Sequence, residues 1–302
     1  MAWKAAFNGG PILLAVSTLA SASTPALDVR LQNYWTSSSD VAAETRRSEI
    51  SRRYYADPGV PPPAAGCTTV AAPARRELFR ATQLVNFYLR DPRLVERLHC
   101  LLTQMEADGT ATALDYRQLH GALLAQRRFA EANALRREHA LDVAQLPDIH
   151  GQQRADRRQV LQLRDAGHAE VVTLPDQGWS MIVVVYPYCG FSRQATAALA
   201  TDPRFADLRG RLQLVLPDDQ TWPVQAVLDW NREHPAMPMQ PLLRSTAWHG
   251  IEFGSTPAFY LTFNGEVVDH ASGWADAGSE IAPLLERLRE ADAGQAAPSS
   301  PP

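Results

Sequence analysis

Cys189 lies in a sequence context that could make its side chain reactive, the stretch MIVVVYPYCGFSRQATAALA. An apolar, β-branched run leads into the cysteine and a helix is predicted directly after it. Unpaired backbone N–H groups and the positive end of the helix dipole would favour the thiolate and lower its pKa from the reference of about 8.5. Ser192 can offer a hydroxyl hydrogen bond to the sulfur, and Arg193 adds positive charge nearby. The thiolate is the nucleophile of disulfide exchange, so this setting predicts a reactive thiol rather than an inert core cysteine.

The other two cysteines, Cys67 and Cys100, both lie in the N-terminal half of the chain. In an oxidising compartment they could pair and leave Cys189 free. Such a disulfide would close a loop of about 33 residues and contribute about 3 kcal/mol by loop entropy. Two buried free thiols are an equally open alternative.

The N-terminus, MAWKAAFNGGPILLAVSTLASAS, has Lys4 before an apolar run that ends in small residues at Ala20 and Ala22. This order is typical of a secretory signal peptide over residues 1–22, cleaved after Ala22. The run is too short to remain as a membrane span. We therefore expect a periplasmic or secreted protein with no stable membrane span after cleavage. Asn8-Gly9-Gly10 interrupts the pattern and leaves open an uncleaved N-terminus in a cytosolic protein.

Composition excludes several function classes. Of the 302 residues 45% are hydrophobic and 21% charged, and the formal net charge is −4. These values are typical of a soluble globular protein, not of a membrane bundle or a basic nucleic-acid-binding protein. No Ser-His-Asp elbow, phosphate-binding glycine loop or HExxH helix appears. We expect no cofactor and no nucleic-acid partner.

The N-terminal half divides into two segments. Residues 23–74 are polar and then rich in proline and alanine, which predicts a linker segment with one helix over residues 40–55. Over residues 75–165 the sequence predicts a small all-α domain, because apolar residues recur at helical spacing in four successive stretches. Its last two helices resemble one tetratricopeptide-type hairpin, a weak signal without a second copy. This helical domain could dock a partner or substrate, or it could serve only as structural support, and the sequence leaves both roles open.

The segment 166–291 alternates strands with helices. Strands are predicted at EVVTLP, WSMIVVVYP and LQLVLP, and Asn264-Gly265 between two alternating runs predicts a β-hairpin. A last helix precedes a tail over residues 292–302 that we expect to be disordered. This order describes an α/β fold with a central mixed sheet flanked by helices.

The order of elements and the residues at their junctions resemble the thioredoxin-like fold over residues 170–291. The matching features are the aromatic-Cys-x-x-x turn YCGFS after a buried strand, the segment GSTPAFYLTFNGEVVDHASGW, and the amphipathic C-terminal helix. In this resemblance Pro257 takes the position of the family's cis-proline and Thr256 precedes it.

The resemblance implies roles for five residues. Cys189 and Ser192 would be catalytic, and Tyr188, Thr256 and Pro257 would bind substrate. The fold's two-cysteine members resolve their own mixed disulfide with a second thiol, and this chain has Ser192 at that position. An external thiol or redox partner would therefore have to release Cys189 from protein clients that carry thiols or disulfides. If the chain is an active enzyme, Ser192 in place of the second cysteine fits isomerase-like or reductase-like exchange best.

Two other resemblances remain open. CGFS is also the signature of monothiol glutaredoxins, which hold an iron–sulfur cluster with glutathione, but FNGEVVDHASGW lacks their glycine pair. Components of bacterial conjugation apparatus also join a helical region to a thioredoxin-like domain, so a non-enzymatic assembly or scaffold protein is the rival from another class. Metal binding by His234, Met237, Met239, His249 and His270 is less favoured, because such residues more often pack or lie on the surface.

Overall fold

The computed structural model describes residues 25–62, 66–275 and 277–292. The signal peptide expected over residues 1–22 lies outside these ranges. The expected tail does too, apart from residue 292, which ends the last helix.

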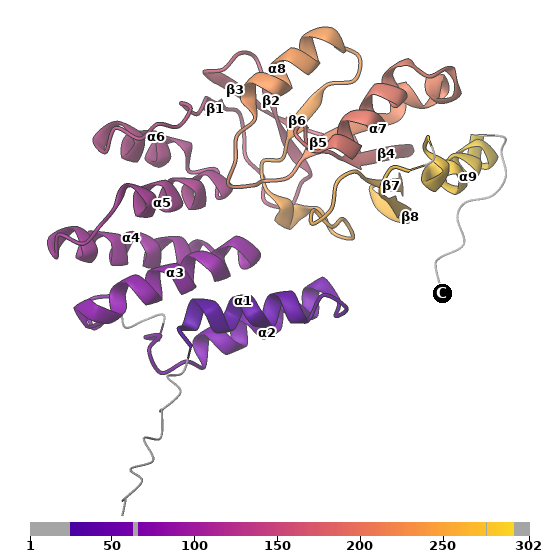
Figure 1. Ribbon diagram of the computed structural model, residues 1–302. Helices are drawn as coiled ribbons and strands as arrows, with labels where there is room; N and C mark the ends of the chain where they lie inside the picture. Colours follow the sequence, from indigo (N-terminus) through magenta and orange to yellow (C-terminus); the bar gives the residue numbers. More distant parts are fainter. Residues whose placement is uncertain (1–24, 63–65, 276, 293–302) are drawn as a thin grey trace, which may run out of the picture.

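In the described part of the N-terminal half the chain forms six helices (Figure 1). They are α1 (Leu27–Ser37), α2 (Ala43–Tyr55), α3 (Ala72–Leu89), α4 (Pro92–Ala107), α5 (Ala113–Ala125) and α6 (Phe129–Glu138). The boundary between α3 and α4 follows from local chemistry. Arg90 ends α3 in the left-handed conformation, with φ 52°, and the Asp91 side chain caps α4 by accepting a hydrogen bond from the Arg93 N–H.

The segment expected to be a linker with one helix over residues 40–55 contains two helices: α2 lies within the predicted range, and α1 was not predicted. Each buries only two side chains: Leu27 and Leu31 in α1, Ile50 and Tyr54 in α2. So few apolar positions leave a weak helical pattern in the sequence. Tertiary contacts supply the rest: Tyr54 shares a hydrogen bond of 2.7 Å with the buried Thr82 hydroxyl of α3.

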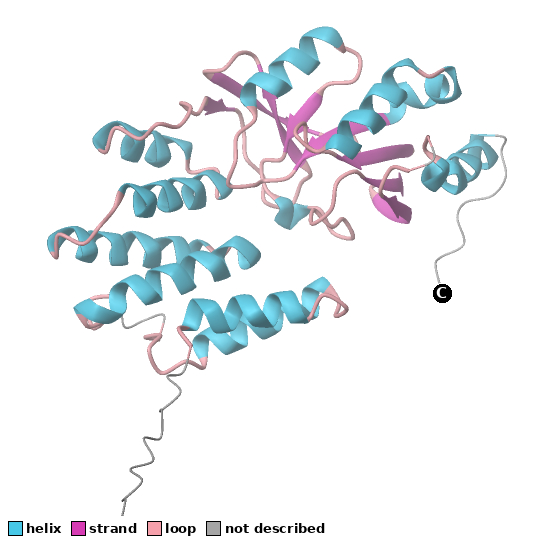
Figure 2. Cartoon of the chain, in the orientation of Figure 1, coloured by secondary structure: helices cyan, strands magenta, loops and turns pink. Residues whose placement is uncertain are grey.

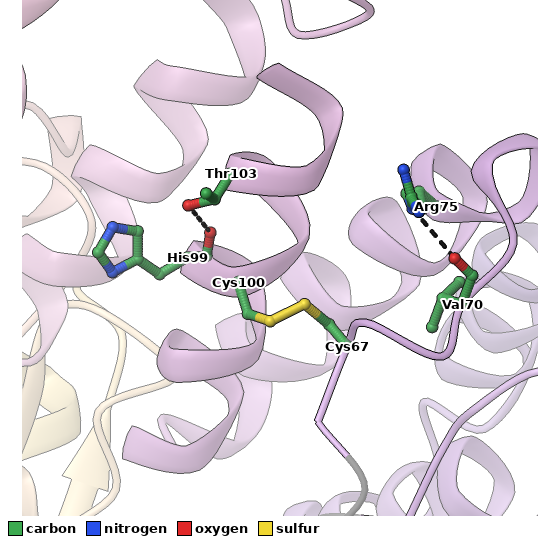
Figure 3. The surroundings of a disulfide bond; sticks show 6 residues. All are labelled: Cys67, Val70, Arg75, His99, Cys100 and Thr103. Carbon is green, nitrogen blue, oxygen red and sulfur yellow. Dashed lines mark hydrogen bonds between the residues drawn. A yellow bond between two sulfur atoms is a disulfide. The ribbon is translucent and has the colours of Figure 1, made fainter. Parts of the chain in front are cut away.

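A disulfide joins Cys67, in the loop before α3, to Cys100 in α4, with their Cα atoms 5.9 Å apart (Figure 3). Nearby, the Arg75 side chain donates to the Val70 carbonyl at 3.0 Å and holds the same loop against α3. The pairing considered from the sequence is thus present, and Cys189 is the free cysteine of the described residues.

The chain then forms two sheets, which occupy the half of the molecule away from α1–α4 (Figure 2). The first is a three-stranded sheet in the order β1-β3-β2, made of β1 (Asp148–His150), β2 (Gln159–Leu163) and β3 (His168–Thr173). Strands β1 and β2 fall inside the segment 75–165, which was assigned to a small all-α domain. Val160 and Leu161 of β2 are fully buried, so its short apolar run packs as a strand.

The second sheet has five strands in the order β6-β5-β4-β7-β8. These are β4 (Trp179–Val184), β5 (Leu212–Leu216), β6 (Met239–Pro241), β7 (Ala258–Phe263) and β8 (Glu266–Ser272). Its helices are α7 (Gly190–Thr201), α8 (Val224–Glu233) and α9 (Ala282–Asp292). The sheet is mixed, because β4 pairs in parallel with β5 and antiparallel with β7. The hairpin predicted at Asn264-Gly265 joins β7 to β8.

The strand expected at EVVTLP belongs to the first sheet, as β3, and not to the sheet that carries β4. The edge beside β5 is formed instead by β6, from the proline-rich stretch after α8. Backbone hydrogen bonds connect the two sheets there: the Leu243 N–H donates to the Gln159 carbonyl at 3.0 Å.

The helices and the five-stranded sheet share one hydrophobic core. Phe79, Leu98 and Leu124 from the helices belong to the same buried set as Val183 and Phe259 from the sheet. Polar contacts reinforce the junction: the buried Arg127, in the turn after α5, donates to the carbonyls of Leu242 at 2.9 Å and Pro217 at 3.5 Å. The helical segment therefore packs as part of one body with the α/β segment.

Candidate functional site

Cys189 lies between β4 and α7, where it is the N-cap residue of the helix. The Cys189 N–H donates to the Tyr186 carbonyl at 3.0 Å, and the Cys189 carbonyl accepts from the Arg193 N–H at 3.0 Å. The first bond closes the turn after the strand and the second begins the helix. This backbone arrangement places the sulfur at the N-terminal end of α7, as the sequence predicted.

Strand pairing explains why the cysteine meets the proline loop. Strands β4 and β7 are antiparallel, with Val184 opposite Ala258, so the end of β4 and the start of β7 lie at the same edge of the sheet. Cys189 follows the first strand and Pro257 immediately precedes the second. The Thr256–Pro257 peptide bond is cis, and the Cys189 thiol lies 3.3 Å from the Thr256 carbonyl oxygen, to which it donates.

The electrostatic setting favours the thiolate of Cys189. Burial of the sulfur opposes ionisation, but it is outweighed by hydrogen bonds from the Ser192 N–H, the Thr256 side chain, the Ser192 hydroxyl and the Phe191 N–H. The pKa of Cys189 therefore lies below its ordinary value. The side chain is only partly buried, so a reagent or client can reach the sulfur.

Ser192 is fully buried beneath this turn. Besides its contribution to the sulfur, its hydroxyl oxygen accepts a hydrogen bond of 3.2 Å from the Tyr186 N–H. Ser192 thus stabilises both the thiolate and the turn that presents it. The guanidinium of Arg193 donates to the Tyr188 carbonyl, directly before Cys189 in the chain, at 3.4 Å.

Two aromatic side chains beside the cysteine are exposed. Tyr188 is 62% and Phe191 is 59% exposed, and each is a chain neighbour or near neighbour of the thiol. Tyr186 lies edge-on to Tyr188, with ring centroids 5.8 Å apart. Exposed apolar surface around a nucleophile suits contact with another macromolecule.

The histidines and methionines considered as metal ligands have other contacts. Met237 and Met239 are buried in the core, and His234 stacks on Trp230 with centroids 3.8 Å apart. His270 stacks on Tyr260, and His249 is exposed. Among the described residues, no three His, Cys, Asp or Glu side chains gather closely enough to hold a metal ion.

Sequence reasoning missed a groove of about 820 Å³ that reaches the site. Thr256 and Tyr186 line it on one side, and residues of α1, α2 and α3 line it on the other. No motif marked these helical residues, because their position opposite Thr256 depends on how the two halves pack.

None of the helices in the described part of the chain has the length and apolar character needed to cross a membrane.

Comparisons with known proteins give one structural similarity. No family model and no curated protein matches the chain. Among solved structures, the chain is similar to the solution structure of a protein from Neisseria meningitidis that carries the provisional name thioredoxin. The two share 18% sequence identity with a TM-score of 0.31, over 45% of this chain and 92% of that one.

Proposed function

We propose that the protein has a thioredoxin-like fold over its C-terminal segment and performs monothiol thiol–disulfide exchange on protein clients through Cys189. The observation that carries the proposal is the position of the sulfur. Cys189 occupies the N-cap position of α7, and its sulfur lies beside the Thr256 carbonyl, partly exposed and with a lowered pKa. The strand order and the Thr256–Pro257 loop support the fold.

Rearrangement of a client's disulfides needs no group beyond Cys189 and the client's own thiols, whereas reduction also needs an external thiol donor. The Cys189 thiolate attacks one sulfur of a client disulfide, a new S–S bond forms, and the other client sulfur leaves as a thiolate. A second thiol then attacks the mixed disulfide and releases Cys189. If that thiol belongs to the client, the client's disulfides are rearranged. If it comes from an external donor, the donor becomes joined to the client sulfur, and a second donor thiol displaces it, so that two donor thiols are oxidised to a disulfide as one client disulfide is reduced.

The reactive state of Cys189 can be measured by iodoacetamide labelling against pH. The thiolate is the reacting form and the site stabilises it, so the labelling rate should reach half its maximum at a pH below about 8.5. Without reductant the disulfide protects Cys67 and Cys100, and Cys189→Ser provides the blank. Ser192→Ala, which removes a hydrogen bond to the sulfur, should move the midpoint upwards.

A thiol that stays unreactive up to pH 9 would contradict the proposed exchange activity. It would favour the scaffold interpretation instead. Disulfide exchange on a client can be tested directly with an enzyme that has been inactivated by scrambling its disulfides. The wild-type chain plus glutathione should restore its activity faster than Cys189→Ser plus glutathione.

A further inference from the structure

The groove that reaches Cys189 has two walls from distant parts of the sequence. One wall consists of α1, α2 and the end of α3; the other consists of the segment 251–256 before β7, together with Tyr186 and Asp219. Figure 1 shows the segment between β6 and β7 on the side of the C-terminal half that faces the N-terminal helices. Thr256 lines the groove and its carbonyl accepts the hydrogen bond of the Cys189 thiol, so the groove passes next to the residue that contacts the sulfur.

The walls are held in place by buried polar contacts. Arg90, at the end of α3, forms an ion pair with the buried Asp218 after β5. Asp218 in turn accepts a hydrogen bond of 2.8 Å from the Ser245 N–H, which begins the opposite wall. This chain of contacts crosses from one half to the other directly below the groove, so the groove is preformed.

Apolar surface is concentrated along this path. Phe87 lines the groove and is 46% exposed, and beside it Trp35 stacks on Tyr88 with centroids 3.6 Å apart. With Tyr188 and Phe191, Phe87 is one of six large apolar side chains that are exposed in the described part of the chain. Half of that exposed set therefore lies in the groove or beside the cysteine, which indicates a binding surface.

Charged side chains line both walls of the groove. Asp219 and Glu252 belong to the wall that carries Thr256, and neither forms an ion pair with a described residue. The helical wall carries Arg46 and Arg47 of α2, together with Glu44 and Arg90. Arg47 is paired with Glu44 at 3.5 Å, whereas Arg46 lies over the Trp35 ring at 4.0 Å and its Nε has no hydrogen-bond partner.

We propose that the groove binds an extended segment of the client protein. Next to the client's reacting cysteine a basic side chain would meet Glu252 and Asp219, an apolar side chain would pack on Phe87, and an acidic side chain would meet Arg46. The helical half would then select clients for the thiol. This inference rests on the proposed exchange function and names the class of client.

The test uses fluorescent peptides and the Cys189→Ser protein, which cannot form a mixed disulfide. One peptide has the order Lys, Cys, Leu, Leu, Glu; the other has the order Glu, Cys, Leu, Leu, Lys. The first should bind at least about tenfold more tightly, as expected for a groove with anchoring contacts. Phe87→Ala should weaken binding about tenfold, and Glu252→Arg should reverse the preference between the peptides.

Matched controls use exposed residues that do not line the groove. Leu114→Ala removes an apolar side chain of 54% exposure from α5, and Glu290→Arg reverses a charge on α9. Both should leave binding unchanged. Equal binding of the two peptides, or equal losses with Phe87→Ala and Leu114→Ala, would overturn the proposed groove function.

The same variants separate this inference from the proposed function. With an intact Cys189, Phe87→Ala should leave the iodoacetamide rate unchanged but slow the reduction of a disulfide-linked peptide. It should have little effect on the exchange rate with oxidised glutathione, because each glutathione extends only one residue to either side of its cysteine and has no apolar side chain to pack on Phe87. If glutathione is affected as strongly as the peptide, the groove binds small thiols and the client-segment proposal is wrong. An unreactive Cys189 would defeat the exchange function, while peptide binding would still report on the groove.

Discussion

Ser192 decides what kind of thiol chemistry Cys189 can complete. Its hydroxyl lies buried under the turn, where it supports the sulfur and accepts the Tyr186 N–H. A hydroxyl cannot attack a disulfide, so a mixed disulfide on Cys189 lasts until another thiol arrives. The position is one helical turn from the cysteine, close enough for a second sulfur to reach the first.

The substitution Ser192→Cys should therefore convert the site into a dithiol. After mild oxidation the variant should lose both thiols in a thiol titration, and mixed disulfides with clients should become short-lived. The variant loses the hydrogen bond that the Ser192 hydroxyl accepts from the Tyr186 N–H, which should lower the free energy of unfolding by about 1 kcal/mol. Trapping of clients by wild-type and variant protein on non-reducing gels measures the change. Persistent mixed disulfides in the variant would show that residue 192 cannot resolve them.

At the scale of single residues the sequence was informative about the site. A cysteine after a β-branched run and before a helix implies an N-terminal cap, and this local inference holds in the structure. The proximity of Cys189 to Thr256 was accessible only through the family resemblance, because the contact joins positions far apart in the chain. The roles proposed for Asp219, Glu252 and Phe87 had no sequence signal, since the residues come together only when the two halves pack.

Secondary-structure elements were predictable where proline or glycine residues lie at the ends of a regular hydrophobic pattern. Helix α4 follows Asp91-Pro92 and ends before Asp108-Gly109, and the β7–β8 hairpin turns at Asn264-Gly265. Helix α1 was missed because two buried leucines make too weak a pattern. The edge strand β6 was missed because its three residues lie among prolines, and only pairing with β5 defines it as a strand.

The turn between α5 and α6 joins these elements through Arg127. The side chain is buried, and its partners are the carbonyls of Leu124, Pro217 and Leu242. Burial lowers the pKa of Arg127 to about 9. Its backbone has φ 56°, which favours glycine over alanine.

Replacing Arg127 should destabilise the whole protein. Arg127→Gly keeps the backbone conformation but leaves buried carbonyls without donors, so we expect a loss of about 3 kcal/mol in the free energy of unfolding. Arg127→Ala should cost about 1 kcal/mol more because of the positive φ. Urea denaturation followed by tryptophan fluorescence measures both. Equal stability of wild type and Arg127→Gly would show that the buried guanidinium contributes nothing net.

At the scale of the whole molecule, the disulfide and the proposed signal peptide point to the same compartment. Exported protein should begin at Ser23, contain the Cys67–Cys100 disulfide and have one titratable thiol. Cytosolic protein made without residues 1–22 should have three. The double variant Cys67→Ala, Cys100→Ala should be less stable by about 3 kcal/mol but keep the Cys189 labelling rate.

N-terminal sequencing, thiol titration and urea denaturation check these outcomes. An exported chain that retains Met1 would contradict the signal peptide. Full stability in the double variant would show that the disulfide does not constrain the unfolded chain. A changed labelling rate would show that the disulfide influences the site, although it lies in the loop before α3 and in α4.

The shared hydrophobic core makes the two halves a single cooperative unit. Apolar side chains of α3, α4 and α5 lie in the same buried set as those of β4 and β7, so cutting the chain between the halves would expose the interior of both. The free energy of binding a ligand in the groove therefore stabilises both halves against unfolding. A client held between the helices and the segment 251–256 would raise the melting temperature of the entire chain, and occupancy would protect the molecule from proteases far from the thiol.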